Sequence, residues 1–170
     1  RVNETKLPLI YLNRTGGQYE LIFDGSSFGL NPDGNKFFSF LEFEEQISII
    51  ELKKENEIWK GKGKIESKLS KEESLYKALV IGLRDYVNNN NFKGVLLGLS
   101  GGIDSALVAA VATDAFGSSS VQAIMLPSPY TGDESLNDAK KTAKLLNINY
   151  SNLKINDAMK IIEEILVEFK

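Results

Sequence analysis

The chain has 170 residues, of which 42% are hydrophobic and 25% are charged, and its formal net charge at pH 7 is −3; this is the composition of a globular protein with one ordinary core or two small ones. The sequence contains no cysteine and no histidine, which excludes disulfides, thiolate metal sites, a cysteine nucleophile and an imidazole ligand or general base. Lysines are interspersed with acidic residues and no apolar run reaches the roughly 18–20 residues that span a bilayer, so we expect a cytoplasmic protein with neither a nucleic-acid nor a membrane partner.

Apolar runs bounded by turn residues fill much of the first fifty residues and predict short β-strands. The expected strands are 7–12, 19–23, 37–40 and 47–50. Residues 15–17 separate the first two strands, and residues 31–34 place proline and glycine where a four-residue turn favours them. We therefore expect a β-meander or the edge of a sheet in this part of the chain.

The composition changes between residues 51 and 68, where charged residues dominate. Such a stretch is typical of an exposed linker and places a domain boundary there. Directly after it, Ser70 and Glu73 have the spacing of a capping box, which predicts that a helix begins at this point. Leucines at helical spacing continue the pattern up to the run of asparagines at 88–91.

From residue 94 onward, the hydrophobic pattern alternates three times between a strand and a helix. The expected strands are 94–99, 121–126 and 148–155, and the helices that follow them end near Phe116, run from Ser135 to about Leu146, and begin at Asn156. Strands that alternate with helices in this way form a parallel sheet with right-handed crossovers. The second half of the chain is therefore predicted to have an α/β fold with a partial Rossmann-like sheet.

A polar segment, SGGIDS at residues 100–105, separates the first of these strands from its helix. Gly101 and Gly102 allow the backbone to curl closely around an anion, and the start of the helix adds unpaired N–H groups. Ser100 and Ser105 add hydroxyl donors. Because phosphates bind at the carboxyl ends of parallel strands, the segment predicts a phosphate cradle. The same residues also fit a plain strand-to-helix turn in which serine and aspartate are caps.

Asp104 is the unexpected member of this segment, because a carboxylate that faces bound phosphates repels them unless a cation lies between. Mg²⁺ is the natural candidate, since it binds carboxylate and phosphate oxygens together. Two common nucleotide motifs are missing from the sequence, the GxxxxGK[ST] loop and the GxGxxG fingerprint. The interpretation therefore depends on the SGGIDS segment itself.

This segment resembles the SGGxDS loop of the N-type ATP pyrophosphatases, which cleave ATP between its α and β phosphates and adenylate a substrate. The loop identifies the superfamily without selecting a member, since GMP synthetase, asparagine synthetase and tRNA-modifying enzymes carry similar loops. Residues 125–139, MLPSPYTGDESLNDA, resemble the MPSPYTS…SxxDA segment of the glutamine-dependent NAD synthetases, with Gly132 as a mild departure. By this resemblance, the backbone near Met125 and Leu126 meets the adenine ring.

Residues 7–28 are similar to the late part of the nitrilase-like glutaminase domain of the same synthetases. The Glu-Lys-Cys triad of that domain would lie upstream of Arg1. The resemblance implies three parts: the C-terminal part of a glutaminase domain at 1–52, a linker at 53–69, and the N-terminal part of the ATP pyrophosphatase domain at 70–170. The chain closes on Lys170 without a polar tail, so we expect an internal fragment that is inactive alone.

The resemblance further implies a ligase that amidates deamido-NAD to NAD through an adenylated intermediate, with glutamine or ammonia as nitrogen donor and AMP and pyrophosphate as products. ATP and Mg²⁺ are the implied cofactors, with Asp104 as the metal ligand, and we expect a homo-oligomer at full length; no catalytic residue is assigned within the chain. The residues expected to bind the nucleotide are Gly98, Leu99, Ser100, Gly101, Gly102, Ile103, Asp104, Ser105, Met125 and Leu126. Two alternatives stay open: another N-type ATP pyrophosphatase, of the GMP synthetase or tRNA-modifying type, and a nucleotide-binding fragment without catalysis.

Overall fold

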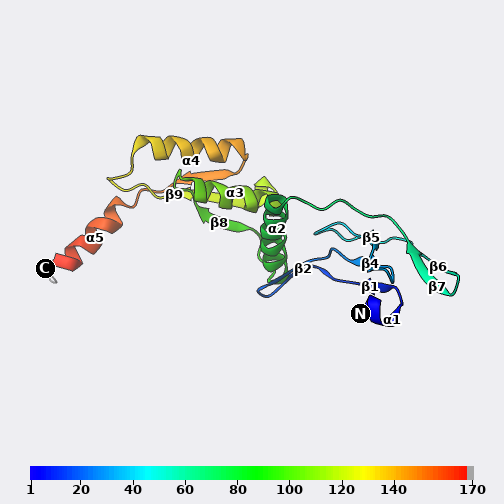
Figure 1. Cartoon of the computed structure of the whole chain (residues 1–170). Helices are drawn as coiled ribbons and strands as arrows, with labels where there is room; N and C mark the ends of the chain where they lie inside the picture. The colour runs from blue at the N-terminus through cyan, green and yellow to red at the C-terminus, as the bar shows by residue number, and fades with distance from the viewer. Residues whose placement is uncertain (168–170) are drawn as a thin grey trace. The chain divides into compact units, whose positions relative to one another are not determined.

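The computed structural model describes residues 1–167 and is drawn in Figure 1. The chain divides into two compact units, Arg1–Tyr86 and Val87–Lys170. The first unit is built mainly from antiparallel strands and the second from a parallel sheet with helices, so the expected α/β class is confirmed. Within the described residues, every helix is too short or too polar to cross a membrane.

An antiparallel sheet in the first unit consists of β1 (Leu9–Tyr11), β4 (Phe28–Leu30) and β5 (Lys36–Ser39), in the order β1-β4-β5, and is preceded by the short helix α1 (Val2–Thr5). The expected turn joins β4 to β5, and within it the Gly34 N–H donates to the Asn31 carbonyl at 2.8 Å. Strand β4 was not predicted, because it is short and has Gly29 at its centre. The ring of Phe38 covers this glycine, since a Cβ on Gly29 would lie 2.4 Å from a ring carbon.

Two β-hairpins complete the strands of this unit: β2 (Thr15–Gln18) with β3 (Leu21–Asp24), and β6 (Glu51–Glu55) with β7 (Ile58–Lys62). Residues 15–17, which were expected to separate two strands, therefore belong to a strand themselves. The second hairpin lies within the charged stretch that was interpreted as a linker. The prediction of a strand at 47–50 is wrong, because these residues pair with no neighbouring strand and Ile47 and Ile49 are exposed.

Helix α2 (Lys71–Asn89) begins at the expected capping box. The Ser70 N–H donates to Glu73 Oε2 at 2.9 Å and the Glu73 N–H donates to Ser70 Oγ at 3.2 Å, so the two residues satisfy each other's amides. Further along the helix, Asp85 Oδ2 accepts the Gly17 N–H of β2 at 2.7 Å. A Cβ on Gly17 would lie 3.2 Å from the Cβ of Asp85, so glycine allows the helix and the hairpin to approach closely.

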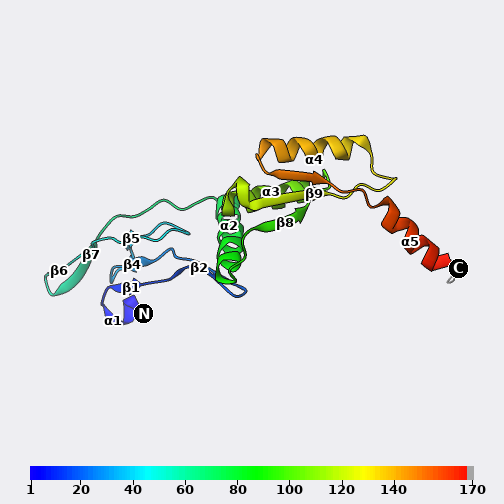
Figure 2. The same cartoon turned by 180° about the vertical axis from the view of Figure 1, so that it is seen from behind.

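The second unit contains a parallel sheet of β8 (Val95–Gly98), β9 (Val121–Met125) and β10 (Asn149–Asn152), in the order β10-β9-β8. The strands are followed by α3 (Ile103–Phe116) with the short helix η1 (Ser118–Ser120), by α4 (Asp133–Leu145), and by α5 (Asn156–Leu166). Helix α3 contacts β8 and β9, α4 contacts β9 and β10, and the two helices contact each other, so both cover one face of the sheet (Figure 2). The predicted parallel sheet is confirmed.

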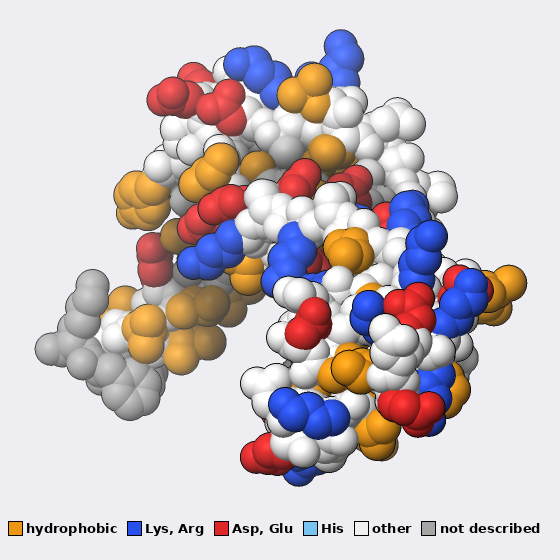
Figure 3. Space-filling view, turned by 45° about the vertical axis from the view of Figure 1, so that its right-hand side comes forward, with side chains coloured by type: hydrophobic (Ala, Val, Ile, Leu, Met, Phe, Trp, Pro, Cys, Tyr) orange, Lys and Arg blue, Asp and Glu red, His pale blue; other side chains and the backbone are white. Residues whose placement is uncertain are grey.

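Small side chains form the core of this second unit. Val121 and Ala123 of β9 are fully buried, as are Ala109 of α3 and Ala139 of α4. Alanines at these positions allow the two helices to lie close to the sheet. Helix α5 differs, because its large apolar side chains are exposed: Ile161, Ile162, Ile165 and Leu166. Figure 3 shows hydrophobic side chains gathered over this helix.

Candidate functional site

The SGGIDS segment connects β8 to α3 at the carboxyl end of the parallel sheet. Leu99 anchors its first residues, because its side chain is 1% exposed and its N–H donates to the Ile124 carbonyl of β9 at 2.9 Å. Helix α3 begins at Ile103, with Gly102 as its N-cap residue in an extended conformation. The first amides of an α-helix have no intrahelical acceptor, so this end of α3 presents N–H groups beyond the edge of the sheet.

Gly101 is the most tightly constrained residue of the segment. Its φ of +88° lies in the left-handed region, and a Cβ would lie 2.3 Å from the backbone oxygen of Ser135. Glycine is therefore required by packing against the start of α4, in addition to any close approach of a ligand. Gly102 differs, since a Cβ there would meet only Ser100 Oγ, at 3.6 Å.

The two serine hydroxyls of the segment bind groups within the segment. Ser105 Oγ accepts the Ser100 N–H at 3.2 Å and donates to the Gly102 carbonyl at 3.0 Å. The two Oγ atoms lie 3.0 Å apart, and the Gly102 N–H donates to Ser100 Oγ at 3.4 Å. Two amides of the expected cradle, those of Ser100 and Gly102, are therefore bound to side-chain hydroxyl groups and not to main-chain carbonyls.

Asp104 lies in the first turn of α3 and its side chain is exposed. In the part of the chain that the structure describes, no group of three or more acidic, cysteine or histidine side chains surrounds a position where a metal ion would fit. A cation bound by Asp104 would therefore need other kinds of ligand, such as phosphate oxygens and water. This donor set fits Mg²⁺, which commonly uses one or two carboxylates together with phosphate oxygens and water.

The second motif begins at the same sheet edge, where β9 ends. In the parallel register Gly98 pairs with Ile124, so the two strands finish side by side. Met125 is buried and its carbonyl accepts the Leu153 N–H at 2.9 Å, whereas the side chain of the next residue, Leu126, is 48% exposed. The carbonyl of Met125 is therefore bound within the sheet, whereas Leu126 is partly exposed to solvent.

The loop between β9 and α4 is held by its own hydroxyl groups. The Ser128 N–H donates to Thr131 Oγ1 at 2.9 Å, and the Tyr130 N–H donates to Ser128 Oγ at 3.2 Å. Helix α4 then begins at Asp133, two residues before the expected start. Sequence reasoning missed Ser135, whose backbone oxygen faces Gly101, because only the folded chain brings these residues together.

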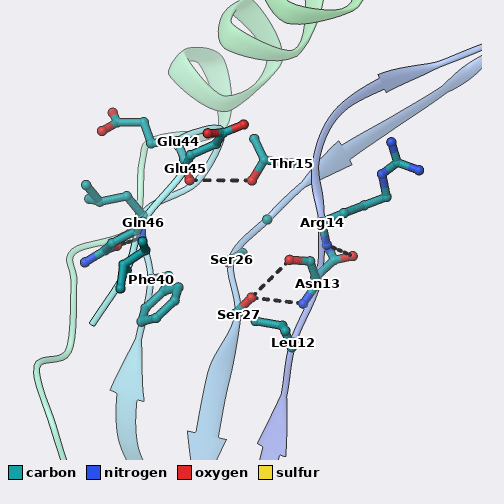
Figure 4. Close-up of a pocket in the computed structure, with 13 residues that line it drawn as sticks. Leu12, Asn13, Arg14, Thr15, Ser26, Ser27, Phe40, Glu44, Glu45 and Gln46 are labelled. Atoms are coloured by element: carbon teal, nitrogen blue, oxygen red, sulfur yellow. Dashed lines mark hydrogen bonds between the residues drawn. The ribbon is translucent and has the colours of Figure 1, made fainter. Parts of the chain in front are cut away.

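A hollow of about 740 Å³ lies in the first unit, next to residues 44–46 (Figure 4). Two of its charged side chains contact neighbouring side chains: Glu44 pairs with Lys77 at 3.0 Å, and the Arg14 guanidinium lies 4.9 Å from the centre of the Phe23 ring. Figure 4 shows Arg14 across the hollow from Glu44 and Glu45. The pairing with Lys77 is typical of an ordinary surface carboxylate and gives Glu44 no evident role in acid–base chemistry.

Comparison with protein families shows that residues 75–170 match the family model described as NAD synthase. The glutamine-dependent NAD(+) synthetase of Rhodobacter capsulatus is 43% identical over 164 residues, which are 96% of this chain and 30% of that protein. The enzyme of the same name from Thermotoga maritima is 35% identical in an alignment 180 positions long, which covers 88% of this chain and 31% of that protein. The chain thus spans about 30% of the length of the curated relatives it matches.

Two solved structures of synthetases are also similar to this chain. The glutamine-dependent NAD+ synthetase of Acinetobacter baumannii, in complex with ADP, matches 99% of this chain and 32% of its own, with a TM-score of 0.92 and 36% identity. The NMN synthetase of Francisella tularensis matches 60% of this chain and 42% of its own, with a TM-score of 0.55 and 31% identity.

Proposed function

The chain belongs to the NAD synthase family, and we propose that it is the part of a glutamine-dependent NAD synthetase where the end of a glutaminase domain is joined to the front of the ATP-binding domain. Relatives that carry this name align with up to 96% of the chain, so the similarity includes the first unit as well as the second. We propose the boundaries 1–52 for the first domain, 53–69 for the connection and 70–170 for the second domain. The family match begins within α2, which supports this division.

The proposed reaction is the ATP-dependent amidation of deamido-NAD. A carboxylate oxygen of the nicotinate group attacks the α-phosphorus of ATP, and pyrophosphate leaves. Ammonia, supplied by glutamine or from solution, then attacks the activated carbonyl, and AMP leaves as NAD forms. We place this reaction in the cytoplasm.

In this proposal the chain's own groups bind and orient the phosphates. The N–H groups at the start of α3 and in the SGGIDS segment donate to the phosphate oxygens and stabilise the charge of the leaving pyrophosphate. Asp104 would hold Mg²⁺, which when bound neutralises charge on the phosphates. The backbone at Leu126 is the expected contact for adenine, because the neighbouring carbonyl of Met125 is already bound within the sheet.

One observation carries the proposal: the two motifs lie together at one edge of the parallel sheet. Strands β8 and β9 end side by side, and the segment after β8 lies against the start of the helix after β9 through Gly101. We therefore propose that the phosphates and the adenine of one nucleotide bind at these adjacent strand ends, the place where α/β sheets bind ligands.

The test is ATP–pyrophosphate exchange by the full-length protein with Mg²⁺. We expect exchange that requires deamido-NAD, and net formation of NAD when ammonia or glutamine is added. Exchange that requires xanthosine monophosphate or a tRNA in place of deamido-NAD would contradict this substrate. ATP binding without exchange under any of these conditions would leave nucleotide binding as the function.

A further inference from the structure

The last residues of β7 and the segment that follows them, 61–66, lie against the antiparallel sheet of the first unit (Figure 1). A parallel bridge pairs Ile65 with Ser39, the last residue of β5. The Ser39 N–H donates to the Lys64 carbonyl at 3.1 Å, and the Glu66 N–H donates to the Ser39 carbonyl at 3.3 Å. The backbone of this segment is therefore hydrogen-bonded to the sheet, although its charged composition is typical of an exposed linker.

Two glycines allow the segment to lie close to the aromatic side chains of β5. A Cβ on Gly61 would lie 2.4 Å from a ring carbon of Phe37, and a Cβ on Gly63 would lie 2.9 Å from the Cβ of Phe38. Both phenylalanines are buried. Asn31 Oδ1 also accepts the Gly61 N–H at 2.7 Å. The segment therefore covers apolar surface of the first unit in addition to its hydrogen bonds with β5.

The hydroxyl of Ser39 binds both backbone groups of Glu66. It accepts the Glu66 N–H at 3.1 Å and donates to the Glu66 carbonyl at 3.3 Å. Ser39 is only 7% exposed, so water has little access to this hydroxyl. Removal of a hydrogen-bond partner from a poorly solvated group costs more than the bond itself contributes. The contact between Ser39 and Glu66 is therefore the point at which a single substitution weakens the attachment most.

The side chain of Glu66 is bound as well. Its Oε1 atom lies 2.7 Å from Lys64 Nζ and accepts Gln46 Nε2 at 3.4 Å. Gln46 Oε1 in turn accepts the Leu41 N–H at 3.1 Å, so Gln46 connects Glu66 to the chain that follows β5. The backbone of Glu66 is thus bound to Ser39, and its side chain is bound to Gln46.

Helix α2 begins shortly after Glu66 and contacts the same unit. Lys77 pairs with Glu44 at 3.0 Å, and Asp85 accepts the Gly17 N–H at 2.7 Å. The match to the NAD synthase family begins within this helix, whereas the compact first unit includes most of it. The boundary of the family and the boundary of the compact unit therefore differ in this chain.

From these contacts we propose that residues 61–66 form a strap, which Ser39 binds to β5 and which holds the start of α2 to the first unit. The connection between the two proposed domains is then an ordered part of the first unit and not a flexible tether. Proteins open locally in cooperative units. The strap and the first turns of α2 belong to the unit that contains β5, and not to the unit that contains the parallel sheet. This inference rests on the proposed domain division and is independent of the proposed reaction.

The experiment compares Ser39→Ala with a matched control, Ser27→Ala, in the full-length protein. Ser27 is also a buried serine, and its hydroxyl accepts the Asn13 N–H at 2.9 Å and donates to the Asn13 carbonyl at 3.3 Å. It therefore makes the same pair of bonds to a different segment. Ser39→Cys is included because a thiol keeps the volume but is a weak donor. Hydrogen exchange is followed without nucleotide in peptides that cover residues 61–68, 70–77 and 121–125.

In the wild-type protein we expect residues 61–68 to exchange much more slowly than unstructured chain. Ser39→Ala and Ser39→Cys should both speed exchange of 61–68 and of 70–77 by about tenfold, the effect of losing one or two hydrogen bonds. Residues 121–125, in β9, should be unchanged. Ser27→Ala should leave residues 61–68 near the wild-type rate. Should Ser39→Ala not fold, Ser39→Cys supplies the same comparison.

Three results would overturn the proposal. Exchange of residues 61–68 in the wild-type protein at the rate of unstructured chain would identify a flexible tether. Equal acceleration of 61–68 by Ser27→Ala and Ser39→Ala would show a general loss of stability. Acceleration confined to 61–68 would show that the strap does not hold α2. Absence of ATP–pyrophosphate exchange would contradict the proposed reaction alone, because the measurements on the strap use no nucleotide.

Discussion

At Gly101, two independent constraints exclude a side chain. Its φ of +88° is strained for any other residue, and a Cβ would collide with the Ser135 oxygen at 2.3 Å. We predict that Gly101→Ala lowers the free energy of unfolding by at least about 1–3 kcal/mol, because the strain of a positive φ is added to the displacement of α4. Urea unfolding measures this loss. Gly98→Ala is the control, since a Cβ on Gly98 meets no atom within 4 Å; equal losses in the two variants would contradict the argument.

The proposed role of Asp104 in binding Mg²⁺ predicts that its charge matters more for the reaction than for stability. Its carboxylate is exposed in the first turn of α3, where the helix dipole gives it only about 0.3–1 kcal/mol. We therefore predict that Asp104→Asn lowers ATP–pyrophosphate exchange by tenfold or more, while urea unfolding changes little. Asp157→Asn, in the first turn of α5, is the matched control. Exchange at the wild-type rate in Asp104→Asn would exclude the proposed role in binding Mg²⁺.

At the scale of one element, the start of α2 makes the stability of the protein depend on pH. The pKa of Glu73 is lowered, first because its carboxylate accepts the Ser70 N–H and then because of the Ser70 hydroxyl. A lowered pKa in the folded state stabilises the protein when Glu73 is ionised. This stabilisation is present above the pKa of the unfolded chain and is lost as the pH falls through the lower folded value.

We predict that Ser70→Ala costs about 0.5–2 kcal/mol near neutral pH, the usual effect of losing an N-cap. We also predict that Glu73→Gln removes the part of the pH dependence that belongs to this carboxyl in the acidic range. Urea unfolding followed from neutral to acidic pH measures both. Glu72→Gln takes a carboxylate from the same turn without altering the bonds between Ser70 and Glu73. If its pH profile changed as much as that of Glu73→Gln, a general charge effect would explain the result.

The capping box also shows why some elements follow directly from the sequence. Ser70 and Glu73 bind each other across three residues, so their spacing alone contains the information. Residues 15–17 were misread for the opposite reason: their strand depends on pairing with β3 and on Asp85, whose carboxylate accepts the Gly17 N–H from far along the chain. The β6–β7 hairpin was missed because its strands are exposed and show little apolar alternation.

The candidate site likewise has features that the sequence predicts and features that it does not. Its position after β8, and the nearness of the segment after β9, follow from the rule that parallel strands end at one edge. The reason for Gly101 does not follow, because the oxygen that excludes a Cβ belongs to Ser135 on a later helix. The hydrogen bond from Ser105 Oγ to the Gly102 carbonyl does not follow from the sequence either, since residue type identifies a hydroxyl donor but not its acceptor.

At the scale of the whole molecule, the exposed apolar face of α5 bears on whether residues 1–170 self-associate when they are studied on their own. Ile161, Ile162, Ile165 and Leu166 are each more than half exposed and form one stripe along the helix. Contiguous apolar surface of this kind promotes association in water. We predict that residues 1–170, studied by themselves, self-associate as concentration rises, which sedimentation velocity measures.

The double variant Ile162→Lys/Ile165→Lys should abolish this association, because the two lysines break the centre of the stripe. Lysine also suits the C-terminal half of a helix, so α5 should keep its helical circular dichroism. Glu163→Lys is the matched control: it changes the net charge by the same two units but lies on the polar side of α5. If Glu163→Lys prevents association equally well, net charge governs it; if only the double variant does so, the apolar stripe of α5 is responsible.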